Sequence, residues 1–473
     1  MLAVRIASIE IHNLKNVGYG RVDLLNDKYS SSVLGLYGQN GSGKTTLIKA
    51  ISILKTLMCG RSLKPAIAAL IKQDKPSAKL TFEFLLSELY TYKKRYSVTY
   101  SFEIVPEETL NPDDGKKIIR TNVINEILKY KEFKASSDYD SDISRRFRLI
   151  LNTGRKEIAT KEIIKLLRRE TSQDKYDLDA IRVLSQAEGR SFAFNFRIGQ
   201  ILLNNAEDPE KQLIMESLLF FAHRSLYSIE NEEFNLISTD ILMVHLKKGI
   251  DEKQSYSAIP ILLNSEVEVP EIFVNDFESI LESLNVVLGA IIPGMSIITE
   301  RISKTTDKEG LPFCRLAVYS QRGNAKVALQ HESEGIKKII SILQLLIYAY
   351  NSKNITIAID ELDAGIFEYL LGEILSIFSS TGKGQLIFTS HNLRPLETMD
   401  KLFIAFTTIN ENKRYVRPTR IKKNNNLRST YYRDIEVSYG QDAFYEAADS
   451  AKIQIAFSKA GRMNRSENET RKA

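Results

Sequence analysis

The chain has 473 residues, more than one typical domain, and its 43% hydrophobic and 26% charged residues are ordinary for a globular protein. Its formal net charge of +6 is too modest to indicate nucleic-acid binding by itself. Two cysteines, Cys59 and Cys314, and five histidines exclude a disulfide framework and a Cys/His zinc cluster. We expect a protein of the reducing cytoplasm with two structural units, or one domain with a large insertion.

The N-terminal part, to about residue 105, predicts strands around one helix. Residues 1–17 alternate apolar and polar side chains as a strand does, and they lack the long apolar core of a secretion signal. Further strands are expected at 31–38, 79–86 and 95–105. The helix follows the second strand, after a glycine-rich turn.

That turn, GQNGSGKTT, fits the phosphate-binding pattern of two glycines bracketing four residues and followed by Lys and Ser or Thr. Its glycines let backbone N–H groups point inward, and the next helix offers its N-terminal donors to the same anion. Lys44 is expected to reach the β- and γ-phosphates of ATP, and the Thr45 hydroxyl to bind Mg²⁺. The flanking strand and helix disfavour an ordinary Gly/Ser loop. The expected nucleotide contacts are Gly38, Asn40, Gly41, Ser42, Gly43, Lys44, Thr45 and Thr46.

From about 106 to 293, helical periodicity and charge predict a mainly helical insertion. Helices are expected at 161–170, 212–226 and 276–292, and loops at 136–144 and 236–258. No heptad is sustained, so we expect a compact insertion rather than an extended coiled coil. The acidic group Asp138, Asp140 and Asp142 is interpreted as part of a solvated loop rather than as a metal site.

Strands return at 296–303, 313–320 and 325–330, followed by a helix from Glu334 whose apolar run is too short to span a bilayer. A β-branched strand within 354–366, a helix and a strand within 384–392 then predict a parallel α/β sheet. The expected divisions are 1–105, 106–293, 294–410 and a basic extension with a disordered tail, 411–473.

Polar residues end both of these last strands. Asp360 follows the first strand, where a carboxylate helps to hold Mg²⁺ together with Thr45. Glu361 comes next, where it could orient and activate the attacking water. His391 ends the next strand at the same sheet edge and could hydrogen-bond the γ-phosphate. The alternatives are that Asp360 and Glu361 form a simple turn after the strand and that His391 is a structural histidine. The presence of the P-loop makes both less favoured.

Residues 412–433 contain no acidic side chain, and this basic stretch has two interpretations. It could bind phosphate backbones or an acidic partner, or it could be a solvated surface loop. Its basic and aromatic members are Lys413, Arg414, Arg417, Arg420, Lys422, Lys423, Arg428, Arg433, Tyr415, Tyr431 and Tyr432.

The order of the motifs resembles the ATP-binding-cassette superfamily, in the branch similar to SMC, Rad50 and RecF. The motifs are the P-loop, then HESEGIKK, AIDELDAG and FTSH. The short strand before the P-loop and the ESEG form resemble most closely the AAA15/AAA21 ATPases of bacterial anti-phage defence, which include the ATPase subunits of PARIS, Septu and abortive-infection systems. The resemblance covers 1–105 and 296–410. It implies an α/β fold, an ABC-ATPase head with a P-loop mixed sheet and flanking helices, that carries the insertion.

The resemblance also implies roles for further residues. Ser333 and Gly335 match the signature that caps the γ-phosphate of the opposite subunit, which calls for a homodimer through the ATP sites or a higher homo-oligomer. Asp363 matches the loop that crosses between the two sites, and Gln73 is a candidate for the lid-loop glutamine. Glutamates on both sides of Ser333 and the large insertion disfavour a transporter motor.

The function implied is an ATP-binding and ATP-hydrolysing sensor and scaffold, with ATP and Mg²⁺ as cofactors. It would control a separate toxic effector, such as a nuclease, in response to a phage protein. The alternative is a DNA-repair or chromosome-maintenance ATPase of the RecF/Rad50 type, so nucleic-acid binding stays open, and no membrane partner is expected. About 80 residues follow His391, too few for a typical added nuclease domain.

Overall fold

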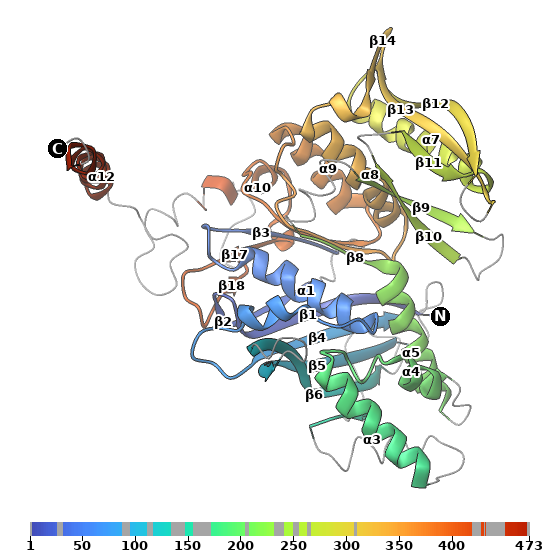
Figure 1. Cartoon of the computed structure of the whole chain (residues 1–473), viewed down its shortest axis with the longest axis vertical. Helices are drawn as coiled ribbons and strands as arrows, with labels where there is room; N and C mark the ends of the chain where they lie inside the picture. The colour runs from blue at the N-terminus through green and yellow to red at the C-terminus, as the bar shows by residue number, and fades with distance from the viewer. Residues whose placement is uncertain are drawn as a thin grey trace.

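The computed structural model describes residues 2–25, 32–87, 95–110, 117–133, 147–154, 172–203, 208–230, 241–248, 255–262, 266–306, 310–418, 427–429, 431 and 450–470. Helix α1 (Lys44–Met58) lies between two six-stranded sheets, one antiparallel and one mainly parallel (Figure 1). It has buried apolar residues around most of its circumference, as a helix enclosed on both sides requires. The P-loop at its N-terminus is therefore held by both sheets.

The antiparallel sheet has the order β2-β1-β4-β5-β6-β7. Buried and less buried residues alternate along β4, so one face of the sheet packs on the core and the other faces solvent. The inner face meets α1 and three helices from the middle of the chain. The strands are β1 (Ala3–Leu14), β2 (Val17–Asp23), β4 (Ala78–Ser87), β5 (Arg95–Leu110), β6 (Lys117–Phe133) and β7 (Arg148–Asn152).

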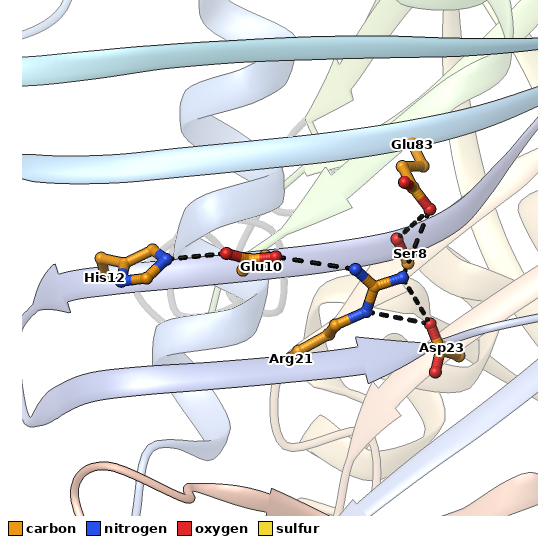
Figure 2. Close-up of polar contacts among 6 residues, drawn as sticks. All are labelled: Ser8, Glu10, His12, Arg21, Asp23 and Glu83. Atoms are coloured by element: carbon orange, nitrogen blue, oxygen red, sulfur yellow. Dashed lines mark hydrogen bonds and ion pairs between the residues drawn. The ribbon is translucent and has the colours of Figure 1, made fainter. Parts of the chain in front are cut away.

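The solvent face of β1, β2 and β4 holds a polar network around Arg21 (Figure 2). The Arg21 guanidinium lies 3.3 Å from Asp23 Oδ1, 3.4 Å from Glu83 Oε2 and 3.6 Å from Glu10 Oε2. His12 Nε2 lies 2.7 Å from Glu10 Oε1. Exposed ion pairs of this kind contribute little stability, and this network marks the solvated face of the strands.

The parallel sheet has the order β18-β17-β3-β16-β15-β8, and all of its neighbouring strands are parallel except β17 and β18. Alternate residues of its strands belong to two different cores: Ala358 packs towards α1, while Ile357 and Ile359 pack towards the opposite face. The strands are β3 (Ser32–Tyr37), β8 (Leu226–Ile229), β15 (Thr356–Ile359), β16 (Gln385–Thr389), β17 (Ile404–Thr407) and β18 (Tyr415–Val416).

Helices cover both sheets away from α1. The far face of the parallel sheet packs against α7 (Val274–Ile291), α8 (Glu334–Asn351) and α9 (Glu368–Thr381). A smaller antiparallel sheet, β11 (Val267–Pro270), β13 (Pro312–Arg322) and β12 (Met295–Thr306), with β14 (Ala325–Ala328), adjoins α7. The remaining short elements are η1 (Pro65–Leu70), η3 (Glu271–Phe273), η4 (Leu329–His331), α10 (Pro395–Thr398) and η5 (Lys401–Phe403).

The expectation of a mainly helical insertion does not hold for much of residues 106–293. Strands β6 and β7 continue the N-terminal sheet, so that sheet does not end near 105. Of the range 236–258, which was expected to be a loop, residues 241–248 and 255–258 belong to a hairpin of β9 (Ile241–Lys248) and β10 (Ser255–Leu262). Among the described residues of this part, helices besides η3 and α7 are α3 (Ser172–Ala187), α4 (Phe196–Leu203), α5 (Pro209–Phe220) and the π-helix η2 (Phe221–Ser225).

The predicted disordered tail is also wrong as far as Thr470, because α12 (Ser450–Thr470) is a helix set apart from the rest of the chain (Figure 1). Its sequence is rich in Ala, Lys, Gln, Arg and Glu, which favour helix. The expected helix at 161–170 and the loop at 136–144, with its acidic group, lie outside the described residues. No helix within the described ranges is long and apolar enough to cross a membrane.

Candidate nucleotide-binding site

The P-loop joins β3 to α1 through glycines that cannot readily be replaced. A Cβ at residue 38 would lie 1.9 Å from Thr407 Oγ1 on β17. Gly43 is the N-cap of α1 with φ +99°, and Gly41 has φ +76°, both in the left-handed region that favours glycine. A Cβ at Gly41 would meet no atom within 4 Å, so the left-handed backbone, and not a lack of space, favours glycine there.

Lys44 is buried at the start of α1, and its ammonium group points back into the loop. Its Nζ donates to Gly38 O at 2.7 Å and to Gln39 O at 3.0 Å. Burial lowers the pKa of Lys44, and the charges of Asp360, Glu361 and Asp363 oppose that shift. Lys44 therefore interacts electrostatically with the acidic residues that follow β15.

Three residues for which the sequence predicted no role at the P-loop support it: Asn16, Arg414 and Tyr415. Asn16, just before β2, accepts from Thr46 Oγ1 at 3.0 Å and donates to the Gly41 carbonyl. Arg414 donates to the Asn16 carbonyl through Nε at 3.1 Å, and Tyr415 donates its hydroxyl to Gly43 O at 2.9 Å. These partners come from opposite ends of the chain, so only the fold brings them to the loop.

The basic stretch is therefore not a uniformly solvated stripe. Arg414 is buried, and Arg417 donates to the carbonyls of Leu402 and Ile404 at 2.8 and 3.2 Å. Burial lowers the pKa of Arg417 to about 10. Tyr431 stacks on Phe406 with ring centroids 5.0 Å apart. The stretch also includes Arg420, Lys422, Lys423, Tyr432 and Arg433, which lie outside the described residues.

The acidic end of β15 faces the start of α1. Asp360 is 1% exposed, and its Oδ1 accepts from Thr389 Oγ1 at 2.6 Å and from Thr45 Oγ1 at 3.3 Å. Parallel strands end at the same sheet edge, which is why β3, β15 and β16 deliver Thr45, Asp360 and Thr389 to one place. The structure thus joins the two ends of the chain at this carboxylate.

Glu361 follows in a left-handed conformation, with φ +46°, that side chains with a Cβ rarely adopt. Its backbone N–H donates to Thr389 Oγ1 at 2.7 Å. Its carbonyl accepts from the Lys338 ammonium group on α8 at 2.7 Å. Two elements from elsewhere in the chain therefore hold the peptide groups on either side of Glu361.

Asp363 lies close to the end of β16. Its Oδ2 accepts from the backbone N–H groups of His391 and Asn392 at 3.0 and 2.9 Å. The sequence placed His391 at this sheet edge, and the structure agrees, with the histidine itself exposed. Asp363 thus fixes the backbone on which that imidazole is carried.

The signature residues begin α8. Ser333 is exposed and caps the helix by accepting from Ile336 N at 3.4 Å. A Cβ at Gly335 would lie 1.9 Å from Gly365 O, so only glycine allows α8 to approach the loop after β15 this closely. Glu332, on the other side of the cap, accepts from Ser320 Oγ at 2.5 Å. Gln73 lies exposed in a turn between η1 and β4, and its lid role stays a prediction.

The residues at the loop fit ATP and Mg²⁺. The described part of the chain has no group of three or more His, Cys, Asp or Glu side chains placed to hold a metal ion. Mg²⁺ in nucleotide sites needs no such group, because one or two protein oxygens and the phosphates suffice. Thr45 and Asp360 supply those oxygens next to the P-loop lysine.

Comparison with known proteins gives a family. Residues 33–400 match the AAA_21 family model, described as "AAA domain, putative AbiEii toxin, Type IV TA system". A search of curated proteins found no match.

Among solved structures, the chain is similar to an SMC head bound to the C-winged helix domain of ScpA, with 14% identity, coverage of 88% of this chain and 98% of that chain, and a TM-score of 0.41. It is similar to the SMC head domain from Thermotoga maritima, with 12% identity, coverage of 87% and 98%, and a TM-score of 0.37. It is also similar to the ATP form of the recombination mediator RecF, with 13% identity, coverage of 82% and 94%, and a TM-score of 0.31.

The family match runs from β3 to α10, and so it contains the P-loop, the start of α8 and the ends of β15 and β16. The sheets with flanking helices give the α/β fold that the sequence predicted. The chain therefore belongs to the AAA_21 family and is a P-loop NTPase.

Proposed function

We propose that this chain binds ATP together with Mg²⁺ and hydrolyses it. The observation that carries the proposal is the approach of Thr45 Oγ1, directly after the P-loop lysine, to within 3.3 Å of Asp360 Oδ1. A hydroxyl after the P-loop lysine and a carboxylate at a strand end are the protein ligands that Mg²⁺ takes in P-loop NTPases. Thr45 and Asp360 would hold Mg²⁺, directly or through water, and the bound ion would supply positive charge against the phosphates.

The loop would hold the phosphates through its backbone N–H groups and the N-terminus of α1. Lys44 would exchange its bonds with the Gly38 and Gln39 carbonyls for bonds with phosphate oxygens. The further nucleotide contacts in this proposal are Asn40, Gly41, Ser42, Gly43 and Thr46.

Glu361 would orient the attacking water and accept its proton. The hydrogen bonds to its backbone N–H and carbonyl would fix the position from which its side chain extends. His391 would hydrogen-bond the γ-phosphate from the end of β16, on the backbone that Asp363 holds. Both side chains belong to the same sheet edge as Asp360.

Glu361→Gln tests the hydrolytic role. The steady-state ATPase rate should fall about 100-fold or more, because the variant side chain cannot accept the proton, while nucleotide affinity should change by no more than about threefold. Glu368→Gln, the same change at an exposed position at the start of α9, is the matched control. Equal rates for the wild type and Glu361→Gln would reject the assignment.

At the level of assembly, we propose a head-to-tail homodimer in which Ser333 and Gly335 cap the γ-phosphate held by the opposite subunit. The exposed N-terminus of α8 supports this dimer, since a helix N-terminus favours an anion.

In the cell, the dimer would be the sensor and scaffold of an anti-phage defence system in the bacterial cytoplasm. It would respond to a phage protein and control a separate toxic effector, such as a nuclease. The toxin–antitoxin description of the family supports the defence part of this proposal.

The native mass of the particle purified with its neighbouring operon products tests this role. It would be measured with and without ATP, for the wild type and for Glu361→Gln. A stable assembly with a second protein is expected and would identify the effector. A lone chain that dimerises only with ATP and retains DNA would favour the repair ATPase instead.

A further inference from the structure

Lys338 is a buried lysine that joins α8 to the end of β15. It is 4% exposed, and its Nζ donates to the carbonyl of Glu361 at 2.7 Å. Lys338 lies about one helical turn after Gly335, where α8 meets the loop at Gly365. The helix therefore contacts the residues after β15 both through backbone packing and through this ammonium group.

The contact falls where the backbone needs support. Glu361 has φ +46°, a conformation that costs free energy for a residue with a Cβ and persists only when its surroundings hold it. Thr389 Oγ1 holds its N–H at 2.7 Å, and Ala364 N and Lys338 Nζ donate to its carbonyl at 3.1 and 2.7 Å. Of these three partners, only Lys338 belongs to the helix that carries the signature.

Lysine is a costly residue to bury unless it is paired. Burial lowers the pKa of Lys338 to about 8, and the charges of Asp363, Glu361 and Asp360 oppose the shift. A buried methionine would fill a similar volume without this desolvation. The retained ammonium group is therefore explained by the carbonyl and carboxylates that it faces.

We propose that Lys338 is a positioning residue that holds the Glu361 backbone and so directs its carboxylate towards the attacking water. This inference rests on the proposed hydrolytic role of Glu361. Because Lys338 and the signature residues share α8, a shift of that helix when a partner's nucleotide is capped would move the Glu361 carbonyl as well. The lysine would then link the dimer contact to hydrolysis.

Lys338→Met and Lys338→Gln test the proposal against Gln344→Met, which changes a buried polar side chain farther along α8. We expect kcat to fall about 10- to 100-fold in Lys338→Met, because a small misplacement of a reacting group has an effect of that size. The Kd for ATP and the melting temperature should stay near those of the Gln344→Met control. Lys338→Gln, which keeps a donor, provides the same comparison if the methionine variant does not fold.

A double-mutant cycle separates positioning from a purely structural role. In a Glu361→Gln background, Lys338→Met should lower the residual single-turnover rate less than about twofold, because the group it positions has been removed. An unchanged kcat in both Lys338→Met and Lys338→Gln would overturn the inference. So would a parallel loss of ATP affinity, or an undiminished tenfold effect in the Glu361→Gln background.

The two proposals can fail separately. If the wild type hydrolyses ATP and Glu361→Gln does not, the proposed function stands, and normal kcat in the Lys338 variants sinks this inference alone. If Glu361→Gln hydrolyses ATP at the wild-type rate, the hydrolytic role of Glu361 has failed first.

Discussion

Thr389 connects the two acidic residues of the candidate site. Its hydroxyl donates to Asp360 Oδ1 at 2.6 Å and accepts from the Glu361 N–H at 2.7 Å. One side chain thus orients a candidate Mg²⁺ ligand and the backbone of the candidate base. In the sequence it is an ordinary threonine before Ser390 and His391, and nothing marks it as part of the site.

Replacing Thr389 by Val should lower the ATPase rate about 10- to 100-fold, because both hydrogen bonds are lost while the shape is kept. ATP affinity should change much less, since the P-loop contacts remain. Steady-state kinetics and nucleotide titration measure the two effects. Thr389→Ser keeps the hydroxyl and should retain most of the activity; if Val is as active as Ser, Thr389 has no positioning role.

At the scale of elements, β6 explains why the middle of the chain was misread. Its buried residues include Thr121 and Val123, and then Glu126, Leu128 and Tyr130, so the alternation changes phase at Asn125, which has φ +52°. A bulge of this kind breaks the period of two that identifies a strand. A charged residue on the buried face hides the pattern further.

Glu126 is that charged residue, and it ties β6 to β5 and to the segment before α4. Its carboxylate accepts from Tyr100 Oη at 2.7 Å, Ser191 Oγ at 2.5 Å and Phe192 N at 2.7 Å. Burial raises the pKa of Glu126, and the donors from Ser191, Phe192 and Tyr100 oppose the rise. A carboxylate can accept all of these bonds, whereas an amide presents its own N–H groups on one side.

Glu126→Gln should therefore lower the free energy of unfolding by about 1–3 kcal/mol, the cost of leaving a buried donor unpaired. Chemical unfolding followed by circular dichroism measures it. Glu103→Gln, the same change at a partly exposed site on β5, should stay within about 0.5 kcal/mol of the wild type. Equal effects of the two changes would contradict the account of the network.

For the whole molecule, the decisive feature is that α1 is enclosed by two sheets whose strands come from both ends of the chain. The second core, with α8 and α9, lies on the opposite face of the parallel sheet. The signature at the start of α8 and the P-loop at the start of α1 thus belong to different layers of one head. In the proposed head-to-tail dimer, a nucleotide capped by both would be shared between two copies.

Ser333→Asp tests that arrangement. The aspartate can still cap α8 through the Ile336 N–H, but it adds a negative charge where the partner's γ-phosphate would lie. We expect the ATP-dependent dimer of the Glu361→Gln protein to weaken about tenfold or more, as measured by light scattering. Ser333→Asn keeps the cap without the charge and should dimerise far better. Identical dimerisation of both variants would contradict the head-to-tail dimer.

Local patterns in the sequence determined the P-loop, the strand ending at Asp360 and the parallel order of the last strands, because glycine spacing and apolar periodicity act over a few residues. They also predicted the helix that begins at Glu334, and the α/β fold class that the structure confirms. The roles of Glu361, His391, Ser333, Gly335 and Asp363 stay predictions.

Tertiary structure alone decided the rest. Asn16, Arg414 and Tyr415 support the loop from opposite ends of the chain, and Lys338 and Thr389 meet at Glu361 from two different elements. Hydrogen bonds between residues that are 23 to 398 positions apart leave no local period or motif. They exist only because the sheets bring their strand ends to one edge.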